Sequence, residues 1–324
     1  MKKIRALLAL FLCLMILTAP ALAADETTAA APDDASQSAD TSAEAAVSAA
    51  PEYHANAKAA LLIDLNTGRT IYEQDADEQV YPASLTKIMT CLLALENGNL
   101  SDTVTITENA YADLVSGSST ADLQVGEQLR LEDLLYCMMV ESGNEAANAV
   151  AEHISGTIED FVKMMNERAY ELGCTHTHFM NPHGLHNESH YTTARDLSLI
   201  VQAALKSGNF RTITNTAEYT LPATNLSDER VLKTTNMLIF QNSGNRYYYP
   251  KAIGIKTGYT TPAGRCVISA AKSSGMFGAA AIAAVLSAKK INENRSTAAQ
   301  LLRRKMREKN SIVGTSSAVR NAVR

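Results

Sequence analysis

A serine and a lysine stand three residues apart at the start of a long apolar segment, and this arrangement limits how the chain can fold. Ser84 and Lys87 lie in residues 81–87, where Pro82 fits at or just before the first turn of a helix. The residues on one side of the following segment recur at helical spacing and are apolar: Ile88, Cys91, Leu92 and Leu95. Side chains three residues apart on a helix share a face. The segment therefore predicts a buried helix that carries Ser84 beside Lys87.

These two side chains have the chemistry of an activated nucleophile. A serine hydroxyl needs a base to take its proton, and a lysine that is desolvated among apolar groups can lose its charge and act as that base. Free N–H groups at the helix N-terminus would stabilise an oxyanion. A Ser-x-x-Lys pair also occurs by chance on amphipathic helices, so the pair needs support from other motifs.

The size and charge of the chain exclude some classes of protein. With 324 residues, of which 46% are hydrophobic and 19% charged, the chain can bury a core of one large domain or two modest ones. Its formal net charge of -5 argues against a general nucleic-acid binder, whose domain is usually basic. We therefore expect a globular protein without a nucleic-acid partner.

The two ends of the chain differ from the part between them. Residues 1–23 have a basic start, an apolar run from 6 to 17 and a small-residue cleavage site, which predicts a signal peptide and an exported, extracytoplasmic protein. The alternative is an uncleaved membrane anchor, for which the run is short. Residues 24–55 are acidic and rich in Ala, Ser and Thr, and we predict a disordered linker there. Residues 310–324 are predicted to be a flexible basic tail.

Cysteines and histidines raise two further possibilities. Four cysteines follow the predicted cleavage site, too few for a disulfide scaffold in a chain of this length, and we expect no structural bridge. Five histidines lie in a predicted loop at 175–193, which invites a zinc hypothesis. Their spacing does not match the helical His-Glu-x-x-His pattern, because Glu188 is misplaced. We therefore expect loop-packing histidines and no metal.

Periodicity and turn residues predict the main elements. Two short apolar runs around Asn66 and Gly68 predict a hairpin, and three apolar runs separated by turns predict a three-stranded meander near the C-terminus. Helices are predicted at 129–140, 145–154, 164–173, 197–205 and 296–309.

Three short motifs occur in an order that is more specific than any one of them. Ser-x-x-Lys begins at Ser84 on a helix, Ser-x-Asn begins at Ser142 on a turn between two predicted helices, and Lys-Thr-Gly begins at Lys256 on a strand. With this set the chain resembles the penicillin-recognising serine acyltransferases, and most closely the low-molecular-weight D-alanyl-D-alanine carboxypeptidases of peptidase family S11. The resemblance runs from about residue 59 to 302, within a predicted catalytic domain of residues 56–309.

The resemblance implies a role for each residue of the first two motifs. Ser84 would attack the carbonyl between two D-alanines, and Lys87 would be its base. Ser142 would relay the proton to the departing D-alanine. Asn144 would hold the substrate amide.

The third motif is implied to bind the end of the substrate. Lys256 and Thr257 would read the terminal carboxylate, and Gly258 and Tyr259 continue the substrate-binding strand. The backbone N–H groups of Ser84 and Tyr259 would form the oxyanion hole. The implied partners are a peptidoglycan stem peptide that ends in D-Ala-D-Ala and β-lactams as covalent inhibitors; no cofactor is implied, and we expect a monomer.

The implied fold is a mixed α/β fold of the β-lactamase and transpeptidase type. An antiparallel sheet would combine the N-terminal hairpin with the C-terminal meander and be flanked by helices. A mainly helical lobe would extend from about residue 100 to 240, with the catalytic groups in the cleft between the two parts. Many relatives carry a further β-rich domain and an anchor helix after the catalytic domain, so the mode of envelope attachment is an open question.

Three other functions are compatible with parts of this pattern. A class A β-lactamase shares the motifs but needs a Glu-x-x-x-Asn in a loop before Lys256, and Glu188 lacks that Asn. A non-catalytic module that binds peptidoglycan or senses β-lactams would keep the cleft, although every motif residue is present here. An endopeptidase acting on cross-links would use the same chemistry with a larger leaving group.

Overall fold

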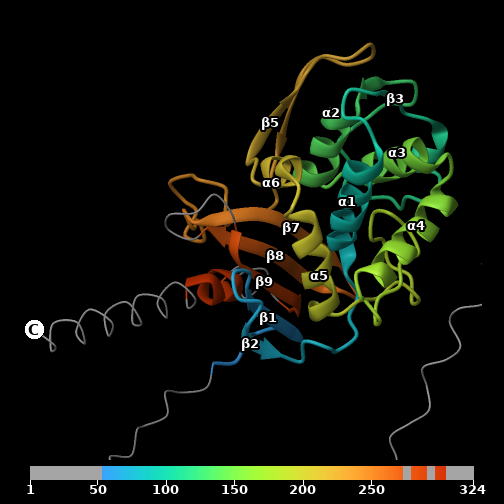
Figure 1. Cartoon of the computed structure of the whole chain (residues 1–324). Coiled ribbons are helices and arrows are strands. Elements are labelled where there is room, and N and C mark those ends of the chain that lie inside the picture. The colour runs from blue at the N-terminus through green and yellow to red at the C-terminus, as the bar shows by residue number, and fades with distance from the viewer. Residues whose placement is uncertain (1–52, 273–278, 290–295, 304–324) are drawn as a thin grey trace, which may run out of the picture. The chain divides into compact units, whose positions relative to one another are not determined.

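A five-stranded antiparallel sheet lies at the centre of the computed structural model, which describes residues 53–272, 279–289 and 296–303. The strand order is β2-β1-β9-β8-β7 (Figure 1). Every neighbouring pair is antiparallel. The bounds are β1 Ala59–Asp64, β2 Thr70–Gln74, β7 Ala252–Thr260, β8 Gly264–Lys272 and β9 Ala279–Ala288.

The predicted hairpin and meander are confirmed, and one long-range pairing joins them. β1 pairs with β9 from Ala59 opposite Leu286 to Asp64 opposite Ala281. The hairpin turn is closed by the N–H of Gly68, which donates to the Asp64 carbonyl at 2.8 Å. Gly68 has φ +70°, a left-handed conformation that glycine adopts without a steric cost.

The sheet is buried on both faces, which explains why β1 shows a continuous apolar run. Successive strand residues point to opposite faces. Leu61 and Ile63 pack into the core that includes the helices, whereas Leu62 packs on the other face with Leu301 and Leu302 of the helix at 296–303. Figure 1 shows this C-terminal helix beside β9, away from α5.

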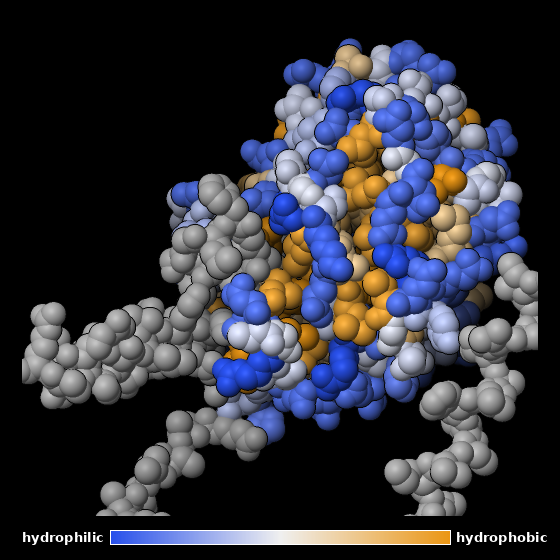
Figure 2. Space-filling model, in the orientation of Figure 1, coloured by the Kyte–Doolittle hydropathy of each residue, from blue (hydrophilic) through white to orange (hydrophobic). Residues whose placement is uncertain are grey.

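The helices form the rest of the main core. Figure 1 shows α1 in the middle of this group, and all but its last residues are buried. Polar side chains cover most of the face drawn in Figure 2, and apolar side chains are visible between them. The bounds are α1 Lys87–Asn97, α2 Leu131–Tyr136, α3 Asn144–Ser155, α4 Ile158–Glu171, α5 Ala194–Ala204 and α6 Gly208–Thr214.

Two predicted helices begin earlier in the structure than in the sequence analysis. α4 begins at Ile158 because the Thr157 hydroxyl accepts the N–H of Asp160, and α5 begins at Ala194 because Thr193 does the same for Asp196. A threonine at this position satisfies an N–H that has no partner within the helix. The predictions for these helices relied on apolar spacing and started too late.

The segment predicted as one helix at 129–140 consists of three different elements in the structure. Its first two residues belong to strand β4 Gln128–Arg130, which pairs with β3 Thr103–Thr105. α2 then continues into a π-helical turn, η3 Cys137–Glu141. π-helical turns occur often at functional sites, and this one ends beside Ser142.

The lobe predicted to be mainly helical also contains elements that were not predicted. These include α6 and a second hairpin, β5 Glu218–Leu221 with β6 Arg230–Lys233. Each strand of this hairpin has only four residues, too short for a clear alternating pattern.

The folded part begins before the predicted linker boundary at residue 55. Ala55 is buried, and its N–H donates to the Tyr72 hydroxyl at 3.1 Å and to Gln74 Oε1 at 2.9 Å. The ring of Tyr53 packs edge-on against Tyr72. Composition alone placed these residues in the linker, because their partners lie on β2.

Other predictions for the chain ends concern residues that the structure does not describe. The predicted signal peptide at 1–23, most of the linker and the basic tail at 310–324 lie outside the described residues. Within the described ranges, no helix has the length and hydropathy needed to cross a membrane.

We expect the hairpin to be essential to the domain, because β1 lies between β2 and β9 in the sheet. A chain that begins at Tyr53 should fold, whereas a chain that begins after Gln74 should fail to show a cooperative thermal transition. Circular dichroism and thermal unfolding measure both. A stable protein that begins after Gln74 would contradict this role of β1.

Candidate active site

Ser84 lies in a short 3-10 turn that leads directly into α1. This turn, η1 Ala83–Thr86, ends where Lys87 begins the α-helix. Lys87 Nζ lies 3.2 Å from Ser84 Oγ, as expected for side chains one turn apart. Ala83 has φ +49°, which is strained for a residue with a Cβ and places the strain directly before Ser84.

Lys87 is fully buried and is surrounded by acceptors. Besides Ser84, its Nζ donates to Asn144 Oδ1 at 2.6 Å and to the His183 carbonyl at 2.7 Å. Burial holds the pKa of Lys87 well below its usual value, and the charge of Lys256 lowers the pKa further. This is the environment in which a lysine loses its proton and can act as a base.

Ser142 lies on the tight turn between η3 and α3. Its φ of +72° and ψ of +28° are left-handed, so the turn holds the side chain in an unusual backbone conformation. Lys256 Nζ donates to Ser142 Oγ at 2.9 Å, although the two residues are 114 positions apart. Burial lowers the pKa of Lys256 to about 7, so its proton can be exchanged near neutral pH.

The third motif brings β7 against η1. A Cβ added to Gly258 would lie 2.9 Å from the Ser84 backbone nitrogen and 3.1 Å from the Ala83 Cβ. Only a residue without a side chain allows this approach. The next residue, Tyr259, is exposed, and the Arg265 guanidinium lies 4.5 Å from the centre of its ring.

All eight predicted site residues therefore lie on elements that meet around Ser84 and Ser142, and two further groups join them. The Thr235 hydroxyl lies 2.5 Å from the Thr257 hydroxyl. The carbonyl of His183 accepts from Lys87, and the loop continues through Gly184 at φ +94°, where a Cβ would overlap the Ala83 carbonyl. His183 and Gly184 lie within the range of the resemblance, which gave them no role, and Thr235 carried no signal in the sequence.

The histidines of the long loop have structural partners. His183 Nε2 pairs with Asp113 at 2.9 Å, and His190 Nε2 contacts the Thr86 hydroxyl at 2.9 Å. Burial lowers the pKa of His190 to about 3, so it stays neutral in the folded protein. Among the described residues, no group of three or more His, Cys, Asp and Glu side chains has the arrangement of a metal site.

The four cysteines that follow the predicted signal peptide are buried free thiols: Cys91, Cys137, Cys174 and Cys266. Burial raises the pKa of each thiol, which disfavours the reactive thiolate. None of them therefore has the environment of a nucleophile.

The arrangement of fold and site recurs in solved structures. The chain is similar to the crystal structure of the DD-transpeptidase of Streptomyces K15, with a TM-score of 0.70 and 33% sequence identity over 78% of this chain and 98% of the other. The fold is therefore that of the serine DD-peptidases.

Sequence comparison gives the family. Residues 44–290 match the peptidase S11 family, D-alanyl-D-alanine carboxypeptidase, and the chain belongs to this family. It is 38% identical over 251 residues to the D-alanyl-D-alanine carboxypeptidase DacF of Bacillus subtilis, covering 76% of this chain and 61% of the relative. It is 35% identical over 230 residues to DacA of Escherichia coli, covering 68% of this chain and 54% of the relative. The chain thus spans about half to two thirds of the length of these relatives.

The contact at Gly258 gives a direct test of the site geometry. In Gly258→Ala the new methyl group must displace η1, and a displacement of about 1 Å at a reacting group costs about a hundredfold in rate. We expect the second-order rate of acylation by a fluorescent penicillin to fall by about that factor.

A matched substitution separates this effect from the general cost of adding a methyl group. Gly208→Ala places a Cβ at an ordinary distance of 3.8 Å from the nearest side-chain atom, on α6. This variant should be acylated at the wild-type rate. Wild-type acylation of Gly258→Ala, with an unchanged melting temperature, would show that β7 does not fix the position of Ser84.

Proposed function

We propose that this protein is a serine-type D-Ala-D-Ala carboxypeptidase that removes the terminal D-alanine from peptidoglycan stem peptides. The observation that carries the proposal is the contact between Lys87 Nζ and Ser84 Oγ at 3.2 Å, in a buried environment that favours a neutral lysine. A neutral amine at this distance can take the hydroxyl proton as the oxygen attacks. Membership of the S11 family supports the substrate.

The first half of the reaction forms an acyl-enzyme. Ser84 Oγ attacks the carbonyl of the penultimate D-alanine while Lys87 accepts the hydroxyl proton. The backbone N–H groups of Ser84 and Tyr259 stabilise the oxyanion. Asn144 Oδ1 is engaged by Lys87, so the amide nitrogen of Asn144 is left to hold the substrate backbone.

A proton for the leaving group completes the first half, because the C–N bond breaks as the acyl-enzyme forms, and the second half then requires a water. Ser142 delivers a proton to the nitrogen of the departing D-alanine, and Lys256, 2.9 Å away, resupplies it. Water then attacks the ester and passes a proton through Ser142 back to Lys256, while Lys87 returns its proton to the departing Ser84 Oγ, so that the shortened peptide is released and the site is restored. A β-lactam resembles the D-Ala-D-Ala end and acylates the same serine, so that we expect covalent inhibition by penicillins. We propose no cofactor and no metal in either half.

The terminal carboxylate of the substrate is proposed to bind along strand β7. Lys256, Thr257 and Gly258 of β7 supply the site, and Thr235 orients the Thr257 hydroxyl through their short contact. A relative is named a D-alanyl-D-alanine carboxypeptidase, and we propose that the signal peptide predicted at residues 1–23 exports this chain to the cell envelope or medium, where it acts as a monomer. The catalytic domain is proposed to span residues 56–309, with the ordered residues 53–55 packed against it.

The nucleophile assignment predicts a complete loss of function in one variant. Ser84→Ala should abolish both release of D-alanine from diacetyl-Lys-D-Ala-D-Ala and labelling by fluorescent penicillin, because it removes the hydroxyl that contacts Lys87 Nζ among the described residues. Ser101→Ala, an exposed serine, is the control and should be fully active. Labelling that persists in Ser84→Ala with an unchanged melting temperature would assign the nucleophile elsewhere.

The carboxylate assignment distinguishes a carboxypeptidase from an endopeptidase. A hydrogen bond to a charged group is worth about 1.5 to 3 kcal/mol, so its loss should lower kcat/KM by roughly ten- to a hundredfold. We expect that decrease both for Thr257→Val and for a peptide whose terminal carboxylate is amidated. The combined effect should be smaller than the product of the two, because both changes remove one interaction.

An amidated peptide cleaved as fast as the free acid would contradict the chain-end assignment. The protein would then be better described as an endopeptidase acting within cross-links. Turnover of penicillin without release of D-alanine would instead favour the β-lactamase alternative, and labelling without any turnover would favour a sensing module.

A further inference from the structure

A buried carboxylate without a part in the proposed reaction lies next to the active site. Glu145 is the second residue of α3, directly after Asn144, and its side chain has no exposed surface. One oxygen, Oε1, accepts the N–H of Ala121 at 2.5 Å. The other oxygen, Oε2, has no hydrogen-bond partner within the described part of the chain. Burying a carboxylate in this way is costly unless neighbouring groups compensate.

Glu145 joins a loop segment to the turn that carries Ser142 and Asn144. The N–H of Asn144 donates to the Ser119 carbonyl at 2.9 Å, so the residues around Ala121 lie along this turn. The contact is close, because a Cβ added to Gly143 would lie 3.2 Å from both the Cβ and the nitrogen of Ala121. The Glu145 carboxylate therefore fixes the segment against two groups of the active site.

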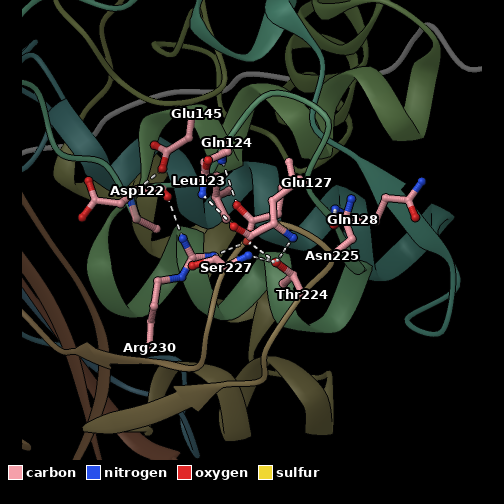
Figure 3. A network of polar contacts seen from close by, with 12 residues as sticks. Asp122, Leu123, Gln124, Glu127, Gln128, Glu145, Thr224, Asn225, Ser227 and Arg230 are labelled. Atoms are coloured by element: carbon pink, nitrogen blue, oxygen red, sulfur yellow. Dashed lines mark hydrogen bonds and ion pairs between the residues drawn. The ribbon is translucent and has the colours of Figure 1, made fainter.

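The same segment is held from its other side by the polar network of Figure 3. Arg230 of β6 donates to the Asp122 carbonyl at 2.6 Å and pairs with Glu127. Glu127 also accepts the N–H of Gln124 at 2.8 Å and the hydroxyl of Thr224 at 2.9 Å. Figure 3 places Glu145 at the opposite end of this chain of contacts from Arg230. The segment is thus anchored at both ends, and Glu145 supplies the anchor nearest Lys87.

The charges around Lys87 give Glu145 a second effect. Burial lowers the pKa of Lys87 most, Lys256 lowers it further, and Glu145 raises it. Burial raises the pKa of Glu145, whereas the N–H groups that face it and the charge of Lys87 lower it. Within the described part of the chain, further titratable groups near this pair are the Tyr111 hydroxyl and the Cys137 thiol beside Glu145, the His183 ring beside Lys87, and Glu141, which acts on Lys256.

We infer that Glu145 is a positioning residue for the acyl transfer, which holds the segment at 119–121 against the Ser142–Asn144 turn and partly balances the charge of Lys87. The charge of Lys256 disfavours an ammonium group at Lys87, and the Glu145 carboxylate opposes that effect. This inference rests on the proposed function for its kinetic part only. The structural part concerns the N–H of Ala121 and can be tested without turnover.

Three substitutions separate the two effects. Glu145→Gln keeps an oxygen for the Ala121 N–H and removes the charge. Glu145→Asp keeps the charge and shortens the side chain, and Glu145→Ala removes both. Glu127→Gln is the matched control, because it removes another fully buried carboxylate of the same network without facing Lys87.

The pH dependence of acylation by penicillin is the kinetic measurement. A carboxylate near Lys87 favours the ammonium form, so its removal lowers the pH at which the neutral base appears. We expect the acidic limb of the rate profile to move to lower pH in Glu145→Gln. The limb should stay in place in Glu145→Asp and in Glu127→Gln. A limb that does not move in Glu145→Gln would overturn the charge-balancing role, because a merely structural residue would change only the plateau.

Hydrogen exchange at the Ala121 amide in the full chain is the structural measurement. The amide should be protected in the wild type and in Glu145→Gln, and exchange at least about tenfold faster in Glu145→Ala, in line with the loss of a hydrogen bond to a charged group. Unchanged protection in Glu145→Ala would overturn the positioning role. A wild-type protein that neither reacts with penicillin nor releases D-alanine would refute the proposed function, and the exchange result would still decide the positioning role.

Discussion

The burial of one lysine is the constraint on which the site depends. Lys87 Nζ is held by Ser84 of η1, Asn144 of α3 and the His183 carbonyl of the long loop. Ser84 is three residues from Lys87 in the sequence, whereas Asn144 and His183 are 57 and 96 residues away. A lysine can remain buried only when its nitrogen is hydrogen-bonded or neutral. The fold satisfies the first condition with the oxygens of Asn144 and His183 as acceptors, and the same burial favours the neutral form, whose lone pair can accept the Ser84 hydroxyl proton.

The second constraint is the close approach of backbone segments around Ser84. A Cβ on Gly184 would overlap the Ala83 carbonyl, and a Cβ on Gly258 would come too close to the Ser84 nitrogen. Ala83 itself has a left-handed φ. The Thr86 hydroxyl donates to the Ala83 carbonyl at 2.8 Å and contacts His190, which stabilises the turn from within. Strain of this kind persists where surrounding contacts determine the conformation. The nucleophile is therefore held by its backbone as well as by Lys87.

Polar contacts hold the lobe opposite the sheet against the turn that carries Ser142. Glu141, the residue before Ser142, accepts the N–H of Lys233 on β6 at 2.8 Å. The Glu127 and Arg230 pair connects the same hairpin to the loop beside Glu145. These contacts place the hairpin β5 and β6 against η3 and explain how short strands with little core of their own can support the Ser142 turn.

The sequence by itself determined the strands of the sheet, the buried helix after Ser84 and the three motifs. These features depend on local periodicity and on residue spacing within one element, which are readable from the chain. The pairing of β1 with β9 and the contact of Lys256 with Ser142 were decided by the tertiary structure, because their partners are far apart in sequence. Thr235 and Glu145 acquire significance only from their neighbours. A threonine next to another threonine, or a glutamate at the start of a helix, is ordinary in a sequence. Proximity to Thr257 gives Thr235 its chemical context, and burial beside the Ser142 turn gives Glu145 its own.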